Sequence, residues 1–275
     1  MITNQTIAVI DFGSQYTQLI ARRIRELNVY SEILPYSITL NELKNKNVKA
    51  IILSGGPSSV YNNNAPKISN SILNAGIPIL GICYGLQLLM YYNGGYVHSS
   101  RKGEYGFAQV KSNVSNILFK GFPKESQVWM SHGDEVKELP TDWEVISRST
   151  NNIIAAVQKK ESKIFGVQFH PEVVHTIYGK ELLSNFIFDI AKCKPEWTPE
   201  NFTKNTIENI KNKVGDENVI CGLSGGVDSS VVATLLHKAI GEKSHCIFID
   251  HGMLRKNESN QVMSTLKNGL GLNIR

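Results

Sequence analysis

Short β-branched runs alternate with helical segments through the first third of the sequence. Residues 6–13 (TIAVIDFG) predict a strand, and residues 14–28 place apolar side chains at helical spacing. The alternation continues through a strand at 48–56, a helix at 67–76, a strand at 77–82 and a helix at 86–93. Such alternation is typical of parallel strands joined by helical crossovers. We therefore predict an α/β fold with an open, mostly parallel sheet flanked by helices.

The next hundred residues add shorter strands to this sheet. The segments from 104 to 172 are brief, turn-separated and strand-like, and some are expected to be antiparallel. Residues 178–191 (YGKELLSNFIFDIA) carry large apolar side chains at helical spacing and close the region. The first domain is expected to cover residues 1–191.

A second unit is predicted after a linker. Residues 192–205 contain two prolines and no periodicity, so they are interpreted as a connection. Residues 206–275 then give a helix, a strand at 218–223, the turn SGGVDSS, a helix at 231–241, a strand at 244–250 and a last helix from about 257. This is the first β-α-β of a Rossmann-like domain whose sheet we expect to be incomplete in the given chain.

Composition excludes several classes of protein. With 41% hydrophobic and 19% charged residues, the chain is typical of a soluble globular protein. It has neither a membrane-length apolar run nor a signal peptide, so we expect a cytoplasmic protein that does not bind membranes. The net charge of +5 comes without a basic and aromatic block, which argues against nucleic acid as a partner. The four cysteines lack zinc-type spacing, so free thiols and no metal site are expected.

One of these cysteines, Cys83, lies in an unusual setting. GICYG at 81–85 places it between Gly81 and Gly85, where a strand ends and a helix begins. We expect the glycines to leave the thiol uncrowded, and the positive end of the helix to favour its thiolate form. The alternative, a buried cysteine acting as a small apolar side chain, stays open from these residues alone.

A cysteine nucleophile needs a base and a group that orients the base. FGVQFHPE at 165–172 supplies His170 and Glu172, and in extended geometry residues two apart point to the same side of the chain. LSGGPSS at 53–59 is a glycine turn after another strand, and its free backbone N–H groups suit an oxyanion.

Taken together, GICYGLQ, SGGP and FHPE closely resemble the motifs of the class I (triad) glutamine amidotransferases. The resemblance implies that Cys83 attacks the side-chain amide of glutamine, with His170 as acid and base and Glu172 as its partner. It implies oxyanion donors at the N–H groups of Gly56 and Tyr84. The resemblance also implies a glutamine pocket, lined by Gly55, Gln87, Ser131, His132 and Asp134.

LSGGVDSS carries a separate signal in the second unit. The loop follows a strand and opens a helix, so its N–H groups and hydroxyls suit phosphate. It lacks the lysine of a Walker A loop and resembles the loop of the N-type ATP pyrophosphatases. This resemblance implies ATP with Mg²⁺ as a substrate complex and no tightly bound cofactor. The implied ATP-binding residues are Ser224, Gly225, Gly226, Val227, Asp228, Ser229 and Ser230.

The order of the two domains resembles the glutamine-dependent synthetases that aminate XMP to GMP. That family implies glutamine, ATP and XMP as substrates, and a homodimer formed through a C-terminal region that the chain lacks. Three alternatives stay open. The first is a synthetase with another ATP-activated acceptor. The second is a non-catalytic regulator that binds glutamine or nucleotide. The third is a cysteine peptidase or hydrolase on the same scaffold, which leaves SGGVDSS unexplained.

Overall fold

The computed structural model describes residues 5–250 and 252–275, and the chain divides into two compact units. The first unit ends at Trp197 and the second begins at Thr198. The segment 192–205 is not a plain linker as expected, because the Trp197 N–H donates to the Asn28 carbonyl at 2.8 Å and helix α6 (Pro199–Val214) begins within the segment. The prolines suggested a loop, but a threonine N-cap followed by proline starts a helix.

The first unit is built on a nine-stranded sheet, in the order β2-β1-β3-β4-β9-β8-β7-β5-β6. The neighbours β2-β1-β3-β4-β9 pair in parallel, and the pairs among β9, β8, β7, β5 and β6 are antiparallel. This confirms the mostly parallel α/β sheet with some antiparallel strands. The strands are β1 (Thr6–Asp11), β2 (Ser31–Pro35), β3 (Val48–Leu53), β4 (Ile79–Ile82), β5 (Tyr96–Ser112), β6 (Glu125–Glu138), β7 (Trp143–Ser149), β8 (Ile154–Lys159) and β9 (Ile164–Val167).

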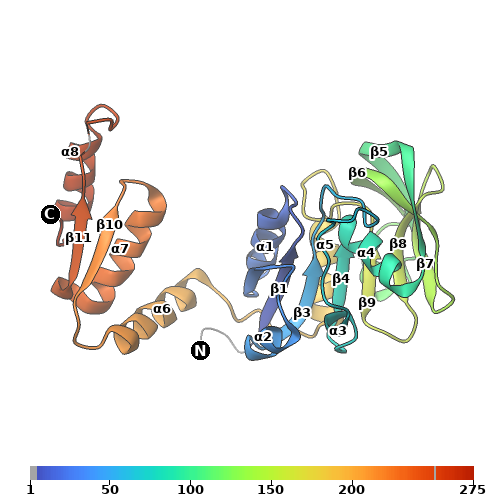
Figure 1. The fold of residues 1–275 in the computed structure, drawn as a ribbon, viewed down its shortest axis with the longest axis horizontal. Helices are drawn as coiled ribbons and strands as arrows, with labels where there is room; N and C mark the ends of the chain where they lie inside the picture. The colour runs from blue at the N-terminus through green and yellow to red at the C-terminus, as the bar shows by residue number, and fades with distance from the viewer. Residues whose placement is uncertain (1–4, 251) are drawn as a thin grey trace. The chain divides into compact units, whose positions relative to one another are not determined.

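Helices cover both faces of this sheet (Figure 1). Alternate side chains of β1 enter different cores: Ile7 and Val9 pack with α1 and α5, whereas Ala8 and Ile10 lie in the cluster of α2, α3 and α4. The helices are α1 (Thr17–Glu26), α2 (Leu40–Asn45), α3 (Asn70–Leu73), α4 (Tyr84–Asn93), the 3₁₀ turn η1 (Ile117–Phe119), and α5 (Gly179–Ser184), which continues as the π-helix η2 (Asn185–Ile190).

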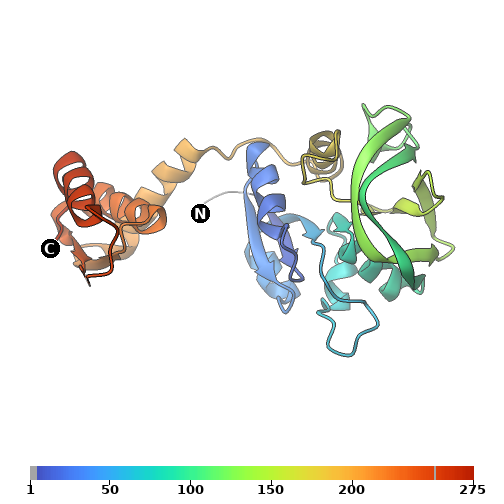
Figure 2. The ribbon, with the colours of Figure 1, turned by 90° about the horizontal axis from the view of Figure 1, so that it is seen from above.

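Strands β5 and β6 are the longest pair and curve together at one end of the sheet (Figure 2). Their antiparallel register shifts between Ser99 and Glu104, and regular pairing resumes with Glu104 opposite His132. The extra residues of this irregularity lie on β5, opposite residues 132–134 of β6.

The second unit contains two parallel strands, β10 (Val219–Leu223) and β11 (Ser244–Phe248), joined by α7 (Val227–Ile240) and the 3₁₀ turn η3 (Gly241–Lys243). This confirms the predicted β-α-β. Beyond β11, α8 (Glu258–Val262) continues as the π-helix η4 (Met263–Gly269), and the chain then returns so that Ile274 bridges Cys246. Ile220 is 72% exposed, so one face of this small sheet is largely bare.

None of the helices in the described residues has the length and apolar character that crossing a bilayer requires.

Candidate active site

Cys83 occupies the sharp turn between β4 and α4. Its backbone has φ 51° and ψ −104°, a conformation that costs energy for any residue other than glycine. The Cys83 N–H donates to the Val167 carbonyl at 2.8 Å, which ties the turn to the end of β9. The side chain is buried, and the first N–H groups of α4 follow it directly. A strained, buried cysteine at a helix start is typical of a nucleophile elbow.

The elbow glycines act differently from our expectation. A Cβ at Gly81 would lie 2.6 Å from the Gly85 carbonyl carbon, and one at Gly85 would lie 2.4 Å from the Leu53 carbonyl oxygen. The two glycines therefore let the backbones of β3, β4 and α4 approach closely, rather than clearing space around the thiol.

His170 and Glu172 form a buried pair. His170 Nδ1 lies 2.8 Å from Glu172 Oε1, and neither side chain is more than 4% exposed. The predicted pairing is present, but the extended geometry is wrong, because β9 ends at Val167 and the two residues lie in a turn around Pro171. The turn brings the carboxylate back to the ring.

Backbone bonds fix the position of His170. Its N–H donates to the Trp129 carbonyl of β6 at 3.0 Å, and its own carbonyl accepts the Thr176 hydroxyl at 2.6 Å. The same Thr176 oxygen accepts the Trp129 N–H at 3.0 Å. The Tyr16 ring meets the imidazole edge-on, with centroids 5.2 Å apart. These contacts hold the ring rigidly between α1, β6 and the turn.

The surroundings keep His170 protonated. Burial lowers the pKa of His170, but hydrogen bonds to Cys83 and Glu172 and the charges of both groups outweigh burial and raise that pKa to about 10. An imidazolium between a sulfur and a carboxylate is the arrangement that stabilises a thiolate nucleophile.

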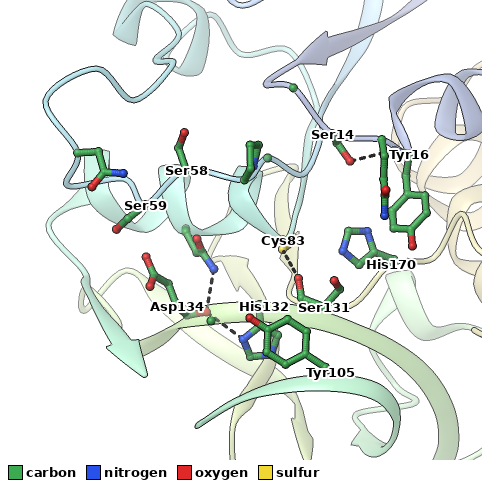
Figure 3. A pocket seen from close by; sticks show the side chains of 17 residues that line it. Ser14, Tyr16, Ser58, Ser59, Cys83, Tyr105, Ser131, His132, Asp134 and His170 are labelled. Carbon is green, nitrogen blue, oxygen red and sulfur yellow. Dashed lines mark hydrogen bonds between the residues drawn. The ribbon is translucent and has the colours of Figure 1, made fainter. Parts of the chain in front are cut away.

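A cavity of about 620 Å³ opens over Cys83 and His170 (Figure 3). Of the other predicted residues, its lining includes Gly56, Gln87, Ser131, His132 and Asp134. Gly55 is not part of the lining. A Cβ at Gly55 would lie 3.3 Å from His170 Cε1, so this glycine makes room for the imidazole ring.

The two predicted oxyanion donors are the N–H groups of Gly56 and Tyr84. Gly56 lines the cavity, and Tyr84 follows Cys83 as the first residue of α4. Within the described residues, neither N–H donates to a carbonyl at the turns and caps. A Cβ at Gly56 would lie 2.8 Å from the Phe12 carbonyl oxygen, so only glycine allows the loop to sit this close to β1.

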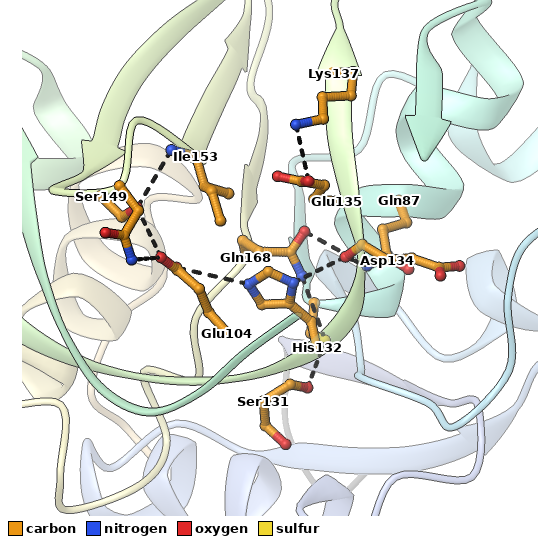
Figure 4. Close-up of polar contacts among 12 residues, drawn as sticks. Gln87, Glu104, Ser131, His132, Asp134, Glu135, Lys137, Ser149, Ile153 and Gln168 are labelled. Carbon is orange, nitrogen blue, oxygen red and sulfur yellow. Dashed lines mark hydrogen bonds and ion pairs between the residues drawn. The ribbon is translucent and has the colours of Figure 1, made fainter. Parts of the chain in front are cut away.

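Gln87 and the segment 131–134 also line the cavity, and Figure 4 shows the polar contacts around them. The Asp134 carbonyl accepts Gln87 Nε2 at 2.9 Å and lies 2.9 Å from His132 Nδ1. The Ser131 carbonyl lies 3.7 Å from the Cys83 sulfur. Asp134 Oδ2 is shielded from solvent and, in the part of the chain described, has no hydrogen-bond partner.

Sequence reasoning missed several residues of the site. Gln168 Nε2 lies 3.6 Å from the Cys83 sulfur, and its side chain is fully buried. A lone polar residue inside the apolar run FGVQF was the available signal. Helical spacing places Tyr16 on the core face of a helix, yet it lines the cavity. The lining also contains Ser14, Ser58, Ser59, Asn62 and Tyr105.

In the second unit, the predicted ATP loop is ordered by its own hydroxyls. The Ser224 N–H donates to Ser229 Oγ at 3.2 Å, and the hydroxyls of Ser229 and Ser230 both donate to the Gly226 carbonyl. Gly225 has φ +79°, and Gly226 is the N-cap of α7. The first N–H groups of α7, which include those of Val227 and Asp228, have no helical partner and point out of the helix start.

A second cavity, of about 320 Å³, adjoins this loop. Gly225 and Ser230 line it, together with Arg255, Gln261 and Thr265 from the segment after β11. Across the described residues, no group of three or more His, Cys, Asp or Glu side chains gathers as a metal site.

Two families match the chain, one in each unit. Residues 8–190 match the family described as "Glutamine amidotransferase class-I", and residues 200–275 match the family described as "NAD synthase". A solved structure from Thermoplasma acidophilum, assigned as one subunit of a GMP synthase, has 34% identity and a TM-score of 0.63, covering 68% of this chain and 94% of its own. A glutamine amidotransferase from Thermotoga maritima, at 20% identity and a TM-score of 0.55, shares the fold.

Longer relatives contain both units. "GMP synthase [glutamine-hydrolyzing]" from Bacillus subtilis (strain 168) is 50% identical over 273 residues, which are 99% of this chain and 53% of the relative. The protein of the same description from Caldicellulosiruptor saccharolyticus is 50% identical over 271 residues, 98% of this chain and 53% of its own length. The present chain therefore spans about half the length of these curated relatives. With the family match over residues 8–190 and the elbow, pair and cavity in place, the chain belongs to the class I glutamine amidotransferases.

Proposed function

We propose that the first unit hydrolyses glutamine to glutamate and ammonia. The observation that carries the proposal is the convergence of Cys83 and His170, from two separate segments, on one cavity of about 620 Å³, with Glu172 paired to His170 at 2.8 Å. A cavity of this size suits a small polar molecule. Gln87 and Asp134 also line this cavity, and their polar groups suit the amide and ammonium groups of an amino acid.

The residues divide the chemistry among them. The Cys83 thiolate attacks the side-chain amide carbon of glutamine, and the N–H groups of Gly56 and Tyr84 stabilise the resulting oxyanion. The His170 imidazolium gives its proton to the departing nitrogen, so that ammonia leaves and a glutamyl thioester remains. The neutral imidazole then takes a proton from water, which attacks the thioester carbon, and glutamate and the thiolate are released. Glu172 orients the ring throughout.

We further propose that, in a protein with the full length of these relatives, the ammonia serves ATP-dependent amination of XMP to GMP. The support is the order of the two units, the SGGVDSS loop at the start of α7, and the relatives described as GMP synthase. In this proposal the Ser224–Ser230 loop holds the ATP phosphates, with ATP entering as its Mg²⁺ complex. A homodimer formed outside the present chain and a cytoplasmic location remain part of the proposal. The test supplies ATP, Mg²⁺, XMP and glutamine to a protein with the full length of these relatives and measures GMP and pyrophosphate. Release of pyrophosphate without GMP would contradict XMP as the acceptor.

The glutaminase roles are tested by two substitutions. His170→Ala removes the proton carrier and should lower kcat by a factor of about 10³ or more. Glu172→Gln should cost less, because the Trp129 and Thr176 bonds still position the turn that carries the ring. The measurement is kcat for glutamate release by both variants. A larger loss in Glu172→Gln than in His170→Ala would reverse the assigned roles.

A further inference from the structure

The cavity wall from Ser131 to Asp134 lies beside the irregular part of the β5–β6 ladder. Regular pairing stops after Ser99 and resumes at Glu104, which is directly opposite His132. The strands nevertheless touch here, since a Cβ at Gly103 would lie 2.2 Å from the His132 carbonyl oxygen. Within this wall only Gly133 falls between the paired residues, and the side-chain contact of Glu104 with His132 lies at the edge of the interruption.

Glu104 and His132 are buried polar partners that face each other across the two strands (Figure 4). Glu104 Oε1 accepts hydrogen bonds from Ser149 Oγ at 3.1 Å and Asn151 Nδ2 at 2.7 Å. Glu104 Oε2 lies 4.0 Å from His132 Nε2, and the two side chains are 11% and 1% exposed. Among the residues the structure describes, both of these atoms lack a hydrogen-bond partner.

The hydrogen bond on the other side of the ring fixes its tautomer. His132 Nδ1 lies 2.9 Å from the Asp134 carbonyl, which can only accept, so Nδ1 carries a hydrogen. In a neutral ring, Nε2 is then a bare lone pair that faces a carboxylate oxygen. Two buried acceptors facing each other repel, and each loses the hydrogen bond it would make in water. One proton between them removes both penalties.

We propose that Glu104 is a positioning residue for glutamine hydrolysis: Glu104 Oε2 and His132 Nε2 share one proton, which locks the wall from Ser131 to Asp134. The inference rests on the proposed glutaminase function. A movement of roughly 1 Å brings the two atoms to hydrogen-bond distance. The locked wall holds the Ser131 carbonyl beside Cys83 and the Asp134 carbonyl against Gln87, so the shared proton acts on the site through the backbone.

The charges around His132 oppose one another. Burial lowers the pKa of His132 most strongly, and the charge of His170 lowers it further; the hydrogen bond to the Asp134 carbonyl and the charges of Glu104 and Glu135 raise it, with a net lowering. Glu135 is itself paired with Lys137 at 2.9 Å. The ring alone therefore holds a second proton poorly, and a proton on it needs the facing Glu104 oxygen, 4.0 Å away, as its acceptor.

The test compares Glu104→Gln with Glu104→Ala. The glutamine variant supplies an N–H that donates to Nε2 and does not titrate, whereas alanine supplies nothing. We expect Glu104→Ala to lower kcat/KM for glutamine about tenfold, mainly through KM. At neutral pH, kcat/KM of Glu104→Gln should be within about threefold of the wild-type value. As pH rises and the pair gives up its proton, kcat/KM should decline in wild type but not in Glu104→Gln. Glu125→Gln, on the same ladder but exposed, is the matched control.

Two results would overturn the proposal. One is a Glu104→Ala variant that matches Glu125→Gln in kcat/KM. The other is a Glu104→Gln variant that is as impaired as Glu104→Ala and keeps the wild-type pH profile. This result would indicate that Glu104 acts only through packing. Nitrogen NMR of the His132 ring gives a readout independent of activity. A pH-dependent step in the His132 nitrogen shifts of wild type that is absent in Glu104→Gln supports the shared proton, even if the chain releases no glutamate. A wild-type spectrum without such a step contradicts the shared proton.

Discussion

His170 Nδ1 and Glu172 Oε1 lie 2.8 Å apart, in a turn in which only Pro171 separates the two residues. Because Nδ1 faces the carboxylate, the other ring nitrogen is the one that serves Cys83. The short loop that connects the pair is anchored to β6 through Trp129 and Thr176, so the orientation of the base depends on strand β6 as well as on Glu172.

Removing the carboxylate should lower the pKa of His170. Glu172→Gln deletes a charge-assisted hydrogen bond and a negative charge, both of which raise that pKa, while burial, which lowers it, remains. The measurement is an NMR titration of the His170 ring in both proteins, with about 10 expected for wild type and a lower pKa for the variant. An unchanged pKa would show that Cys83 alone holds the proton.

The same shift links stability to pH. Since the pKa of His170 is raised on folding, its protonation stabilises the fold fully below the unfolded value near 6.5, and this contribution is lost as pH rises through about 10. The free energy of unfolding of wild type should therefore fall over this window more than that of Glu172→Gln. The comparison uses denaturant unfolding at pH 6 and at pH values approaching 10.

Gly85 should be the least replaceable residue of the elbow. An alanine Cβ there would lie 2.4 Å from the Leu53 carbonyl oxygen, a backbone atom that cannot move without displacing β3. We expect Gly85→Ala to destabilise the first unit by about 3 kcal/mol and to impair glutamate release. Gly222→Ala is the control, because nothing lies within 4 Å of its added Cβ. Equal midpoints of thermal unfolding in the two variants would contradict this account of the turn.

The second unit should be cleaved by trypsin before the first. Helix α6 has no buried residue, and Lys204, Lys211 and Lys213 lie along it. The small core of this unit leaves Ile220 and Ile249 more than two thirds exposed, so local opening costs little. Limited proteolysis followed by mass spectrometry should find the earliest cuts beyond residue 198, with the first unit intact. Initial cuts within β1–β9 would contradict the expectation that the first unit is more stable than the second.

Periodicity and motif order were sufficient to predict the parallel core of the sheet and the pairing of His170 with Glu172. The parallel strands form continuous apolar runs, and the three motifs end strands that meet at one sheet edge, which is why residues 53–59, 81–85 and 165–172 come together. The elements β2 and α2 went unassigned, because the SEILP strand is short and partly charged. A capping box formed by Thr39 and Glu42 was the local signal for α2.

Other features of the site depend on tertiary structure and leave no mark in sequence spacing. The side chain of Gln168 reaches the Cys83 sulfur only because β9 is paired with β4. Tyr16 continues the apolar spacing of α1 and is therefore expected in the core, yet the helix begins one residue later and the ring turns toward His170. The Glu104–His132 pairing follows from a register shift that no local pattern predicts.

The central claim is that Cys83 carries the chemistry, and it is tested most directly by glutamate release from glutamine. Cys83→Ala removes the only thiol that lines the cavity among the described residues, so we predict a loss of essentially all activity. Cys193→Ala is the matched control, because burial raises the pKa of that thiol to about 11 and it lies outside the cavity. Wild-type rates in Cys193→Ala with none in Cys83→Ala are the predicted result, and equal glutamate release by wild type and Cys83→Ala would contradict the account.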